Sequence, residues 1–217
     1  MVFEARRNIH GKKVVKVVFT GGPCAGKSTS IERVKELVDK KYGKEWNCYT
    51  TAEAASVLYS TGRVSRADLI GERLKRWQRD IVECSMTFEG VFDNIAADEP
   101  KRHTLIMCDR GAIDSKVFTP PHMWTEILKE MKTNEEKLIQ RYDLVLVLHT
   151  APDVNYTCEN NRLRRETPEK ARLIDMRYSQ IWKNHKNMIE IEANNENGME
   201  EKFIAVWEQI ERFLTCN

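Results

Sequence analysis

The sequence contains no long apolar run. The longest, residues 144–148, is far shorter than the ~20 apolar residues that span a lipid bilayer, so we expect no transmembrane segment. The first residues carry Glu4, Arg6 and Arg7 and lack the apolar stretch and small-residue cleavage site of a secretory signal. These absences favour a cytoplasmic location.

Paired cysteines and clustered histidines are also missing. The six cysteines are scattered without a C-x-x-C pair, and the five histidines show no ligand spacing. This distribution is typical of reduced thiols and argues against both a disulfide framework and a zinc site.

A large excess of one charge is absent as well. The 217 residues carry 35 Lys+Arg and 33 Asp+Glu, a net charge of +2. Near neutrality argues against a protein that grips the phosphate backbone of nucleic acid. The length, together with the absence of internal repeats and linkers, predicts one domain over residues 1–217.

Short β-rich runs alternate with longer amphipathic segments. This alternation predicts an α/β fold in which five parallel strands form a sheet with helices on both faces. We expect strands at 14–20, 47–51, 104–108, 143–149 and 187–193, and helices at 27–41, 65–97, 123–131, 168–185 and 199–214.

One strong motif follows the first expected strand. Residues 21–28 match G-x-x-x-x-G-K-[ST], the Walker A or P-loop pattern, and they open a predicted helix. Glycines let the backbone wrap a polyphosphate, the amide groups point inward, and Lys27 reaches the β- and γ-phosphates. We predict that the nucleotide is held by Gly21, Gly22, Pro23, Cys24, Ala25, Gly26, Lys27, Ser28 and Thr29.

A P-loop also needs an acidic partner for Mg²⁺. Asp109 directly follows the strand at 104–108, so we predict that Ser28 and Asp109 hold the metal, although Asp109 also suits a turn. The adjacent Arg110 is a candidate for binding a phosphate or an acidic acceptor. Asp114 suits an acceptor hydroxyl and a helix cap equally well.

Further candidates lie near the expected crevice beyond the strand ends. Glu53 follows the second strand, where a carboxylate can orient or deprotonate an attacking hydroxyl; its alternative role is to complement a helix dipole. Asp109 is the other catalytic candidate for orienting that hydroxyl. Gln78 is a candidate for reading a base or sugar edge, and equally a structural glutamine. Asn194, after the fifth strand, is a candidate contact for the donor base.

Three arginines lie within four residues, at Arg162, Arg164 and Arg165, after the fourth strand. Phosphoryl transfer requires cations over the migrating group, so we predict an Arg-rich lid at about residues 155–168, with Arg162 and Arg164 as catalytic candidates. The alternative is a solvated helix face.

These motifs together resemble a known family. T-G-G-P-C-A-G-K-S-T at 20–29, E-A-A at 53–55, D-R-G at 109–111 and R-R-E-T at 164–167 occur in the order seen in P-loop AAA domains of the NadR and TRPL-translocation-defect type. The resemblance covers about residues 14–214. It implies a nucleoside-kinase-like fold, phosphate binding by 21–29, Mg²⁺ at Ser28 and Asp109, a lid role for Arg164 and an acidic role for Glu53.

Two functional classes follow. The NadR-type relatives resemble a nicotinamide riboside kinase, which favours a Mg²⁺-dependent kinase that uses ATP or GTP and a nucleoside- or nucleotide-like acceptor. Other relatives resemble GTP- and phospholipid-binding proteins, so the alternative is a nucleotide switch or slow NTPase with a protein or lipid partner. No N-K-x-D motif for guanine is present, and the base preference and oligomeric state stay open.

Overall fold

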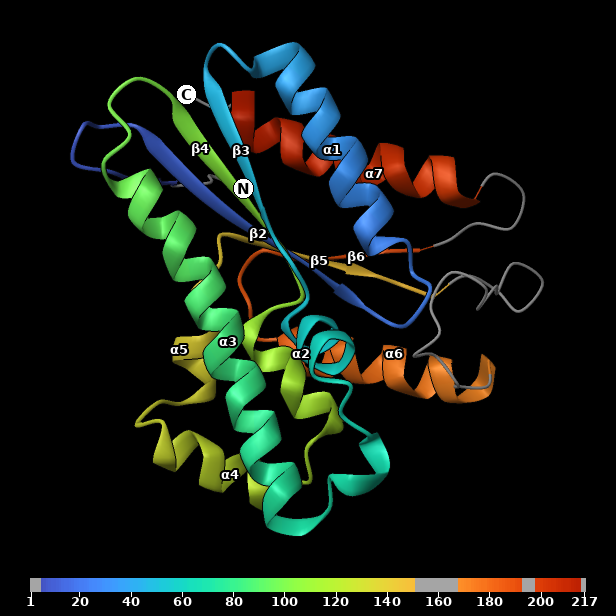
Figure 1. Cartoon of the computed structure of the whole chain (residues 1–217). Helices are drawn as coiled ribbons and strands as arrows, with labels where there is room; N and C mark the ends of the chain where they lie inside the picture. Colours follow the sequence, from blue (N-terminus) through green and yellow to red (C-terminus); the bar gives the residue numbers. More distant parts are fainter. Residues whose placement is uncertain (1–4, 151–167, 193–197, 216–217) are drawn as a thin grey trace.

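The protein is built around a central parallel sheet (Figure 1). The computed structural model describes residues 5–150, 168–192 and 198–215. Five parallel strands lie in the order β3-β4-β2-β5-β6, which confirms the predicted sheet. Their bounds are β2 Lys13–Gly21, β3 Trp46–Thr51, β4 His103–Asp109, β5 Leu144–Leu148 and β6 Met188–Ile191.

A short sixth strand was not predicted. Strand β1, Arg6–Arg7, pairs antiparallel with the start of β2. It consists of two exposed arginines, and so short a segment carries no alternation of apolar and polar residues from which a strand can be recognised.

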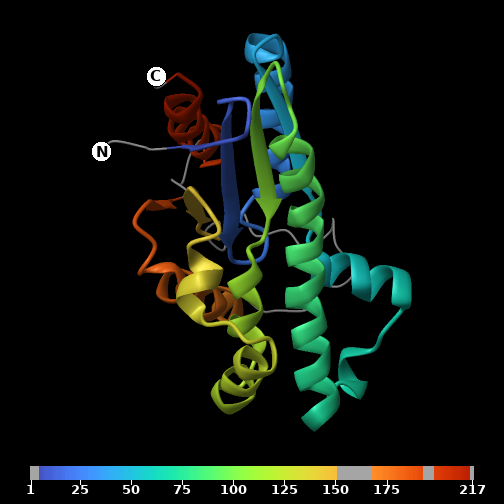
Figure 2. The same cartoon turned by 90° about the vertical axis from the view of Figure 1, so that its left-hand side faces the viewer.

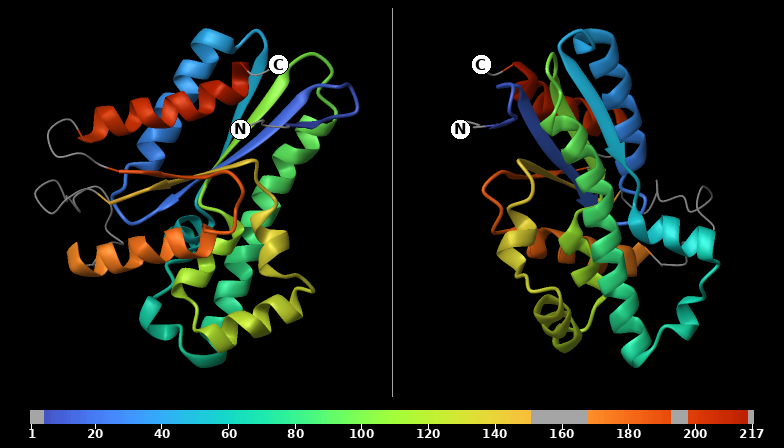
Figure 3. Two further views of the ribbon diagram at one scale, coloured as in Figure 1. Left: turned by 180° about the vertical axis from the view of Figure 1, so that it is seen from behind. Right: turned by 60° about the vertical axis from the view of Figure 1, so that its left-hand side comes forward.

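Helices cover both faces of the sheet, as predicted. Alternate residues of β2 point to opposite faces, so Val15 and Val17 join one core and Val14 and Val18 the other. The first face is covered by α1, Lys27–Tyr42, and α7, Gly198–Thr215, which lie together in Figures 1 and 3. The second face is covered by α3 Gly71–Ala97, the 3-10 segment η2 Ala112–Phe118, α4 Pro121–Glu130, α5 Glu135–Ile139 and α6 Pro168–Trp182.

The predicted helix at 65–97 is wrong at its beginning. A 3-10 turn, η1 Arg66–Asp68, comes first, and α3 starts only at Gly71. Ile70 is extended and Gly71 has a left-handed φ of 54°, so the chain turns sharply there and no helix runs through. Figure 2 shows α3 running along the sheet and beyond its end.

Three short elements were missed in the sequence: α2 (Ala54–Gly62), η2 and α5. Each is too short to show a helical repeat of apolar residues. They matter because α2 and η2 follow β3 and β4 directly and carry residues that line a cavity at this end of the sheet.

Strand β2 lies where the order of strands reverses, between β4 and β5. In open α/β sheets, ligands bind outside the carboxyl ends of the strands at such a switch point. The loop after β2 therefore occupies the ligand-binding position of this fold. No helix among the described residues is long and apolar enough to cross a membrane.

Candidate functional site

The loop between β2 and α1 depends on two glycines. Gly21 has a φ of 121°, and a side chain there would collide with the carbonyl oxygen of Leu148 on β5. Gly26 has a φ of 83°, and its Cβ would lie 2.7 Å from Cε of Met199. The positive φ explains both glycines of the motif, and at Gly21 the approach of the Leu148 backbone adds a second reason.

Lys27, at the first position of α1, is buried beneath the loop. Its Nζ donates to the carbonyl oxygen of Gly22 at 2.7 Å and to that of Gly21 at 3.3 Å. The ammonium group therefore bonds to the loop that it is predicted to serve, and contact with a phosphate requires it to exchange these carbonyl partners.

Ser28 and Asp109 meet at the carboxyl end of the sheet. The Ser28 hydroxyl donates to Oδ2 of Asp109 at 2.8 Å, whereas Oδ1 is buried with no hydrogen-bond partner among the described residues. Burial raises the pKa of Asp109, nearby Lys27 opposes that rise, and Glu53 adds to it. A hydroxyl beside an unsatisfied carboxylate oxygen is a donor set that fits Mg²⁺.

Arg110 connects the loop to the neighbouring carboxylate. Its left-handed backbone, with φ of 80°, accompanies a side chain whose Nη1 donates to the Gly21 carbonyl at 2.6 Å and whose Nε donates to Glu53 at 3.3 Å. The guanidinium also lies 4.5 Å from the ring centre of Tyr178 on α6. Arg110 is thus held on three sides.

Glu53 lies between β3 and α2. Its Oε2 accepts from the Ser56 hydroxyl at 2.6 Å, and its Oε1 accepts from Arg110. Burial alone raises the pKa of Glu53, but the charge of Arg110 and the Ser56 hydroxyl outweigh burial, so the pKa lies below its usual value. Glu53 is therefore ionised at neutral pH.

Both carboxylate oxygens of Asp114 already accept hydrogen bonds. Its Oδ2 accepts from the Thr20 hydroxyl at 2.7 Å and from the Gly111 amide at 3.1 Å, and its Oδ1 accepts from the Trp182 indole at 2.7 Å. These bonds tie η2 to the end of β2 and to α6. Its predicted contact with an acceptor stays a prediction.

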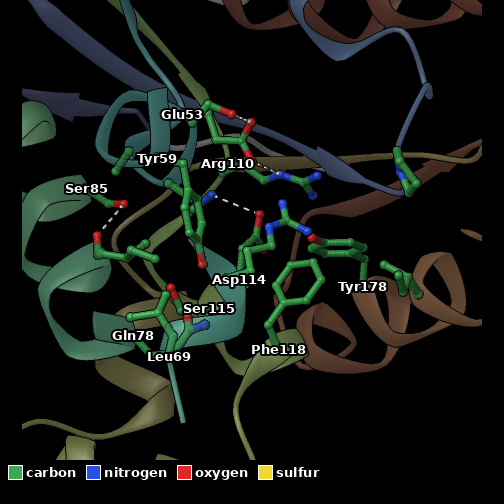
Figure 4. Close-up of a pocket in the computed structure, with 18 of the residues that line it drawn as sticks. Glu53, Tyr59, Leu69, Gln78, Ser85, Arg110, Asp114, Ser115, Phe118 and Tyr178 are labelled. Atoms are coloured by element: carbon green, nitrogen blue, oxygen red, sulfur yellow. Dashed lines mark hydrogen bonds and ion pairs between the residues drawn. The ribbon is translucent and has the colours of Figure 1, made fainter. Parts of the chain in front are cut away.

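A cavity of about 270 Å³ adjoins these residues. Glu53 and Arg110 lie toward one end, and Gln78, Leu69 and Phe118 toward the other (Figure 4). The walls combine charged groups near the loop with aromatic and aliphatic groups farther away, as small-molecule sites usually do. The lining also includes Pro23, Tyr59, Arg66, Leu74, Asp114, Ser115 and Tyr178.

Gln78 lies in the α3 wall of this cavity. The residue is 5% exposed, and within the described part of the chain no group hydrogen-bonds to its side-chain amide. The amide atoms are not among the fully buried atoms that lack a partner, so a ligand in the cavity that Gln78 lines can bond to them. This isolation fits the predicted contact with a base or sugar.

Sequence reasoning missed the aromatic residues of the cavity. Tyr59, Phe118 and Tyr178 come from α2, η2 and α6 and meet only in the folded chain. An aromatic residue on an amphipathic helix is usually predicted to belong to the hydrophobic core. The local sequence around these three residues therefore does not indicate that they line a cavity. Arg162, Arg164, Arg165 and Asn194, with the predicted lid, lie outside the described residues.

Comparison with known proteins agrees with this fold. Thymidylate kinase from Ehrlichia chaffeensis superimposes with a TM-score of 0.58 and 12% identity, covering 91% of this chain and 98% of that chain. The match indicates a P-loop nucleotide kinase fold. Because the sequence identity is low, the similarity shows the fold alone. No curated protein sequence matches significantly.

A protein-family model described as an AAA domain matches residues 16–202, which include the phosphate loop, Glu53 and Asp109. The narrower NadR-type resemblance stays a prediction. The family supports nucleotide binding at the loop after β2. With a match over most of its length, the chain belongs to this AAA domain family.

Proposed function

We propose that the protein is a Mg²⁺-dependent phosphotransferase that moves the γ-phosphate of ATP or GTP to a hydroxyl group of a nucleoside- or nucleotide-like acceptor. The observation that carries this proposal is the cavity beside the phosphate loop, with Glu53 and Arg110 at its loop end. A kinase needs a second pocket whose ligand faces the γ-phosphate, whereas a nucleotide switch does not.

On the donor side, the loop amides and Lys27 would neutralise the transferring phosphate. Ser28 and the unsatisfied Oδ1 of Asp109 would hold Mg²⁺, directly or through its water. When bound there, the metal would spread the charge of the β- and γ-phosphates. Arg162 and Arg164 are proposed to supply further cations from the lid.

On the acceptor side, an ionised Glu53 suits a hydroxyl nucleophile. A carboxylate beside the loop can accept the proton of an attacking hydroxyl or orient it, and it repels an acceptor that leads with a phosphate. Arg110 bonds to both Glu53 and the loop carbonyl of Gly21, so it fixes the carboxylate relative to the donor. Catalysis would be mainly positioning and electrostatics.

The unpartnered amide of Gln78 supports a polar, planar acceptor. It lies on the wall opposite the Glu53 end, where a base or a carboxamide can satisfy both its donor and its acceptor atoms. Tyr59 and Phe118 supply apolar walls around it.

The test is an acceptor screen. The protein is incubated with Mg²⁺, with ATP or GTP, and with nucleosides, nucleotides and nicotinamide riboside in turn, and product masses are recorded. We expect one acceptor to gain a single phosphoryl group. Tight nucleotide binding with no phosphorylated product from any acceptor would instead select the alternative, a nucleotide switch or slow NTPase acting through a protein or lipid partner.

A further inference from the structure

A second buried lysine touches the phosphate loop, from the helix at the other end of the chain. Lys202, on α7, is 1% exposed. Its Nζ donates to the carbonyl oxygen of His149 at 2.6 Å and to that of Ala25, inside the loop, at 3.2 Å. His149 is 53 positions and Ala25 is 177 positions from Lys202, so the contact joins three distant parts of the chain.

The contact with Ala25 determines how one loop peptide faces. A trans peptide group is planar, and its C=O and N–H point in opposite directions. When Lys202 holds the oxygen of Ala25, the N–H of Gly26 must point away from Lys202. In a loop of this kind the inward-pointing amides cradle the phosphates.

The charge of Lys202 is only partly offset by its neighbours: burial lowers the pKa of Lys202, and the charges of Asp175 and Glu192 oppose that effect without overcoming it. Both of its acceptors are backbone carbonyls, and no carboxylate in the described ranges 5–150, 168–192 and 198–215 lies within ion-pair distance of it. A buried, unpaired cation is costly, and a structural role alone needs no charge there. A polyphosphate on the loop would supply the missing negative charge.

Asp175, on α6, orients the Gly21–Gly22 peptide at the start of the loop by binding its amide group, whereas Lys202 binds a carbonyl group. Its Oδ1 accepts from the Gly22 amide at 2.7 Å. By the same planarity, the oxygen of Gly21 points the other way, toward Arg110 and Lys27, with which it bonds. The loop thus has its two ends oriented by side chains from α6 and α7.

From these contacts we infer that Lys202 is a positioning residue of the phosphate site: it orients the Ala25–Gly26 peptide so that the Gly26 amide faces a bound polyphosphate, and it adds positive charge behind the loop. The inference rests on nucleotide binding in the proposed function. It concerns the donor's phosphates and makes no claim about the acceptor.

The test compares two buried lysines. Lys202→Met removes the ammonium group beside the loop, and Lys16→Met removes one that is equally buried, 1% exposed, but pairs with Glu89 and Asp93 away from the loop. Affinity for a non-cleavable Mg-triphosphate and for tripolyphosphate is measured by titration calorimetry, with the folded fraction determined by thermal melting.

We expect Lys202→Met to weaken both ligands about 10- to 100-fold, the range for a lost charged hydrogen bond, and Lys202→Arg to restore most of the affinity. Lys16→Met should lower the melting temperature and leave the affinity of the folded fraction unchanged. In the kinase assay, Lys202→Met should raise KM for the donor and leave KM for the acceptor unaltered.

Wild-type affinity in folded Lys202→Met, or an equal loss in Lys16→Met, would overturn the inference and leave the proposed function standing. If Lys202→Met does not fold, Lys202→Gln, which keeps a neutral hydrogen-bond donor, is measured in its place. We expect this variant to lose about tenfold in affinity, and unchanged affinity would contradict the inference. If the wild-type protein binds neither ATP nor GTP, the proposed function falls and this inference falls with it.

Discussion

Two clusters of charged and hydroxyl side chains differ in how completely their buried atoms are paired. The first, here called the Glu89 cluster, consists of Lys16, Glu89, Asp93, Arg141 and Tyr142. Glu89 accepts from Lys16 at 3.3 Å, from Arg141 at 2.7 Å and from the Tyr142 hydroxyl at 2.6 Å, and Lys16 also bonds to Asp93 at 2.6 Å. Each charge there faces an opposite charge or a hydroxyl.

The second, here called the site cluster, consists of Ser28, Glu53, Asp109, Arg110 and Tyr178. Two of its buried oxygens, Oδ1 of Asp109 and the Tyr178 hydroxyl, have no hydrogen-bond partner among the described residues. Within the same described residues, no buried side-chain atom of the Glu89 cluster lacks a partner. Native proteins rarely leave such atoms unsatisfied. The difference indicates that the Glu89 cluster serves stability, and it supports the proposal that the site cluster binds a ligand.

Breaking the closed cluster should have the largest effect, and on stability alone. Glu89→Gln leaves Lys16 with Asp93 as its remaining carboxylate and leaves Arg141 beside a neutral group, and removing one partner of a buried ion pair costs about 3–5 kcal/mol in the free energy of unfolding. Denaturant titration measures this loss. Nucleotide affinity per folded molecule should be unchanged, and a parallel fall in affinity would show that the two clusters are not separate in function.

Lys27→Ala removes charge at the open site. Its Nζ donates to the carbonyl oxygens of Gly21 and Gly22, and in the proposed function its charge would act on the β- and γ-phosphates. We expect phosphoryl transfer or Mg-nucleotide binding to fall about 100- to 1000-fold with little change in unfolding free energy. Lys35→Ala is the control, because Lys35 lies on the same helix with an exposed side chain paired to Asp39. Unchanged calorimetric titration of Lys27→Ala would remove the lysine from the phosphate site.

Glu53→Gln tests the acceptor half of the site. The amide keeps the shape of the carboxylate but can no longer take a proton, so turnover should fall about 100-fold or more. Donor affinity should stay nearly intact, as measured by titration with the non-cleavable analogue. Full turnover in this variant would limit Glu53 to its contacts with Ser56 and Arg110.

The sequence predicted the parts of the molecule that depend on local pattern. The strand at 13–21, the loop glycines and the helix after them follow each other directly, so a motif and an apolar run suffice to locate them. The positions of Glu53 and Asp109 at the carboxyl edge of the sheet also followed, because parallel strands end at one edge, whereas the pairing of β3 with β4 was not predicted.

Contacts between distant segments were not predictable in the same way. Arg110 reaches Gly21 and Glu53 from a left-handed backbone, which nothing in D-R-G indicates. The isolation of Gln78 depends on its neighbours in α2 and η2, two elements too short to be recognised. In the sequence, Lys202 is one of several charged residues in an amphipathic helix. Its contact with the loop is evident only from the packing of α7 in the folded chain.

The smallest expected effect distinguishes two histidines. His185 belongs beside the Glu89 cluster: its Nε2 bonds to the Tyr142 carbonyl at 2.9 Å and its Nδ1 accepts from the Asn187 amide at 3.1 Å, so the neutral ring uses both nitrogens. Burial lowers the pKa of His185. His149 lies beside the loop, where a hydrogen bond from its ring to Asp175 at 2.8 Å raises the pKa of His149 despite burial.

These shifts predict opposite pH dependences of stability. As pH falls through about 6.5, the unfolded chain takes up a proton that folded His185 resists, so His185 makes the folded state less stable in acid. Folded His149 binds its proton more tightly than the unfolded chain does, so its stabilisation is complete below about pH 6.5 and is lost as pH rises through the folded pKa.

From pH 7.5 to 5.5, the difference in unfolding free energy between wild type and His185→Asn should shrink, and that between wild type and His149→Asn should grow. Neither slope can exceed about 1.4 kcal/mol per pH unit for one proton. Denaturant titrations at several pH values measure both differences in unfolding free energy. If the two differences change in the same direction with pH, the two histidines do not differ in the way that the Glu89 cluster and the site cluster do.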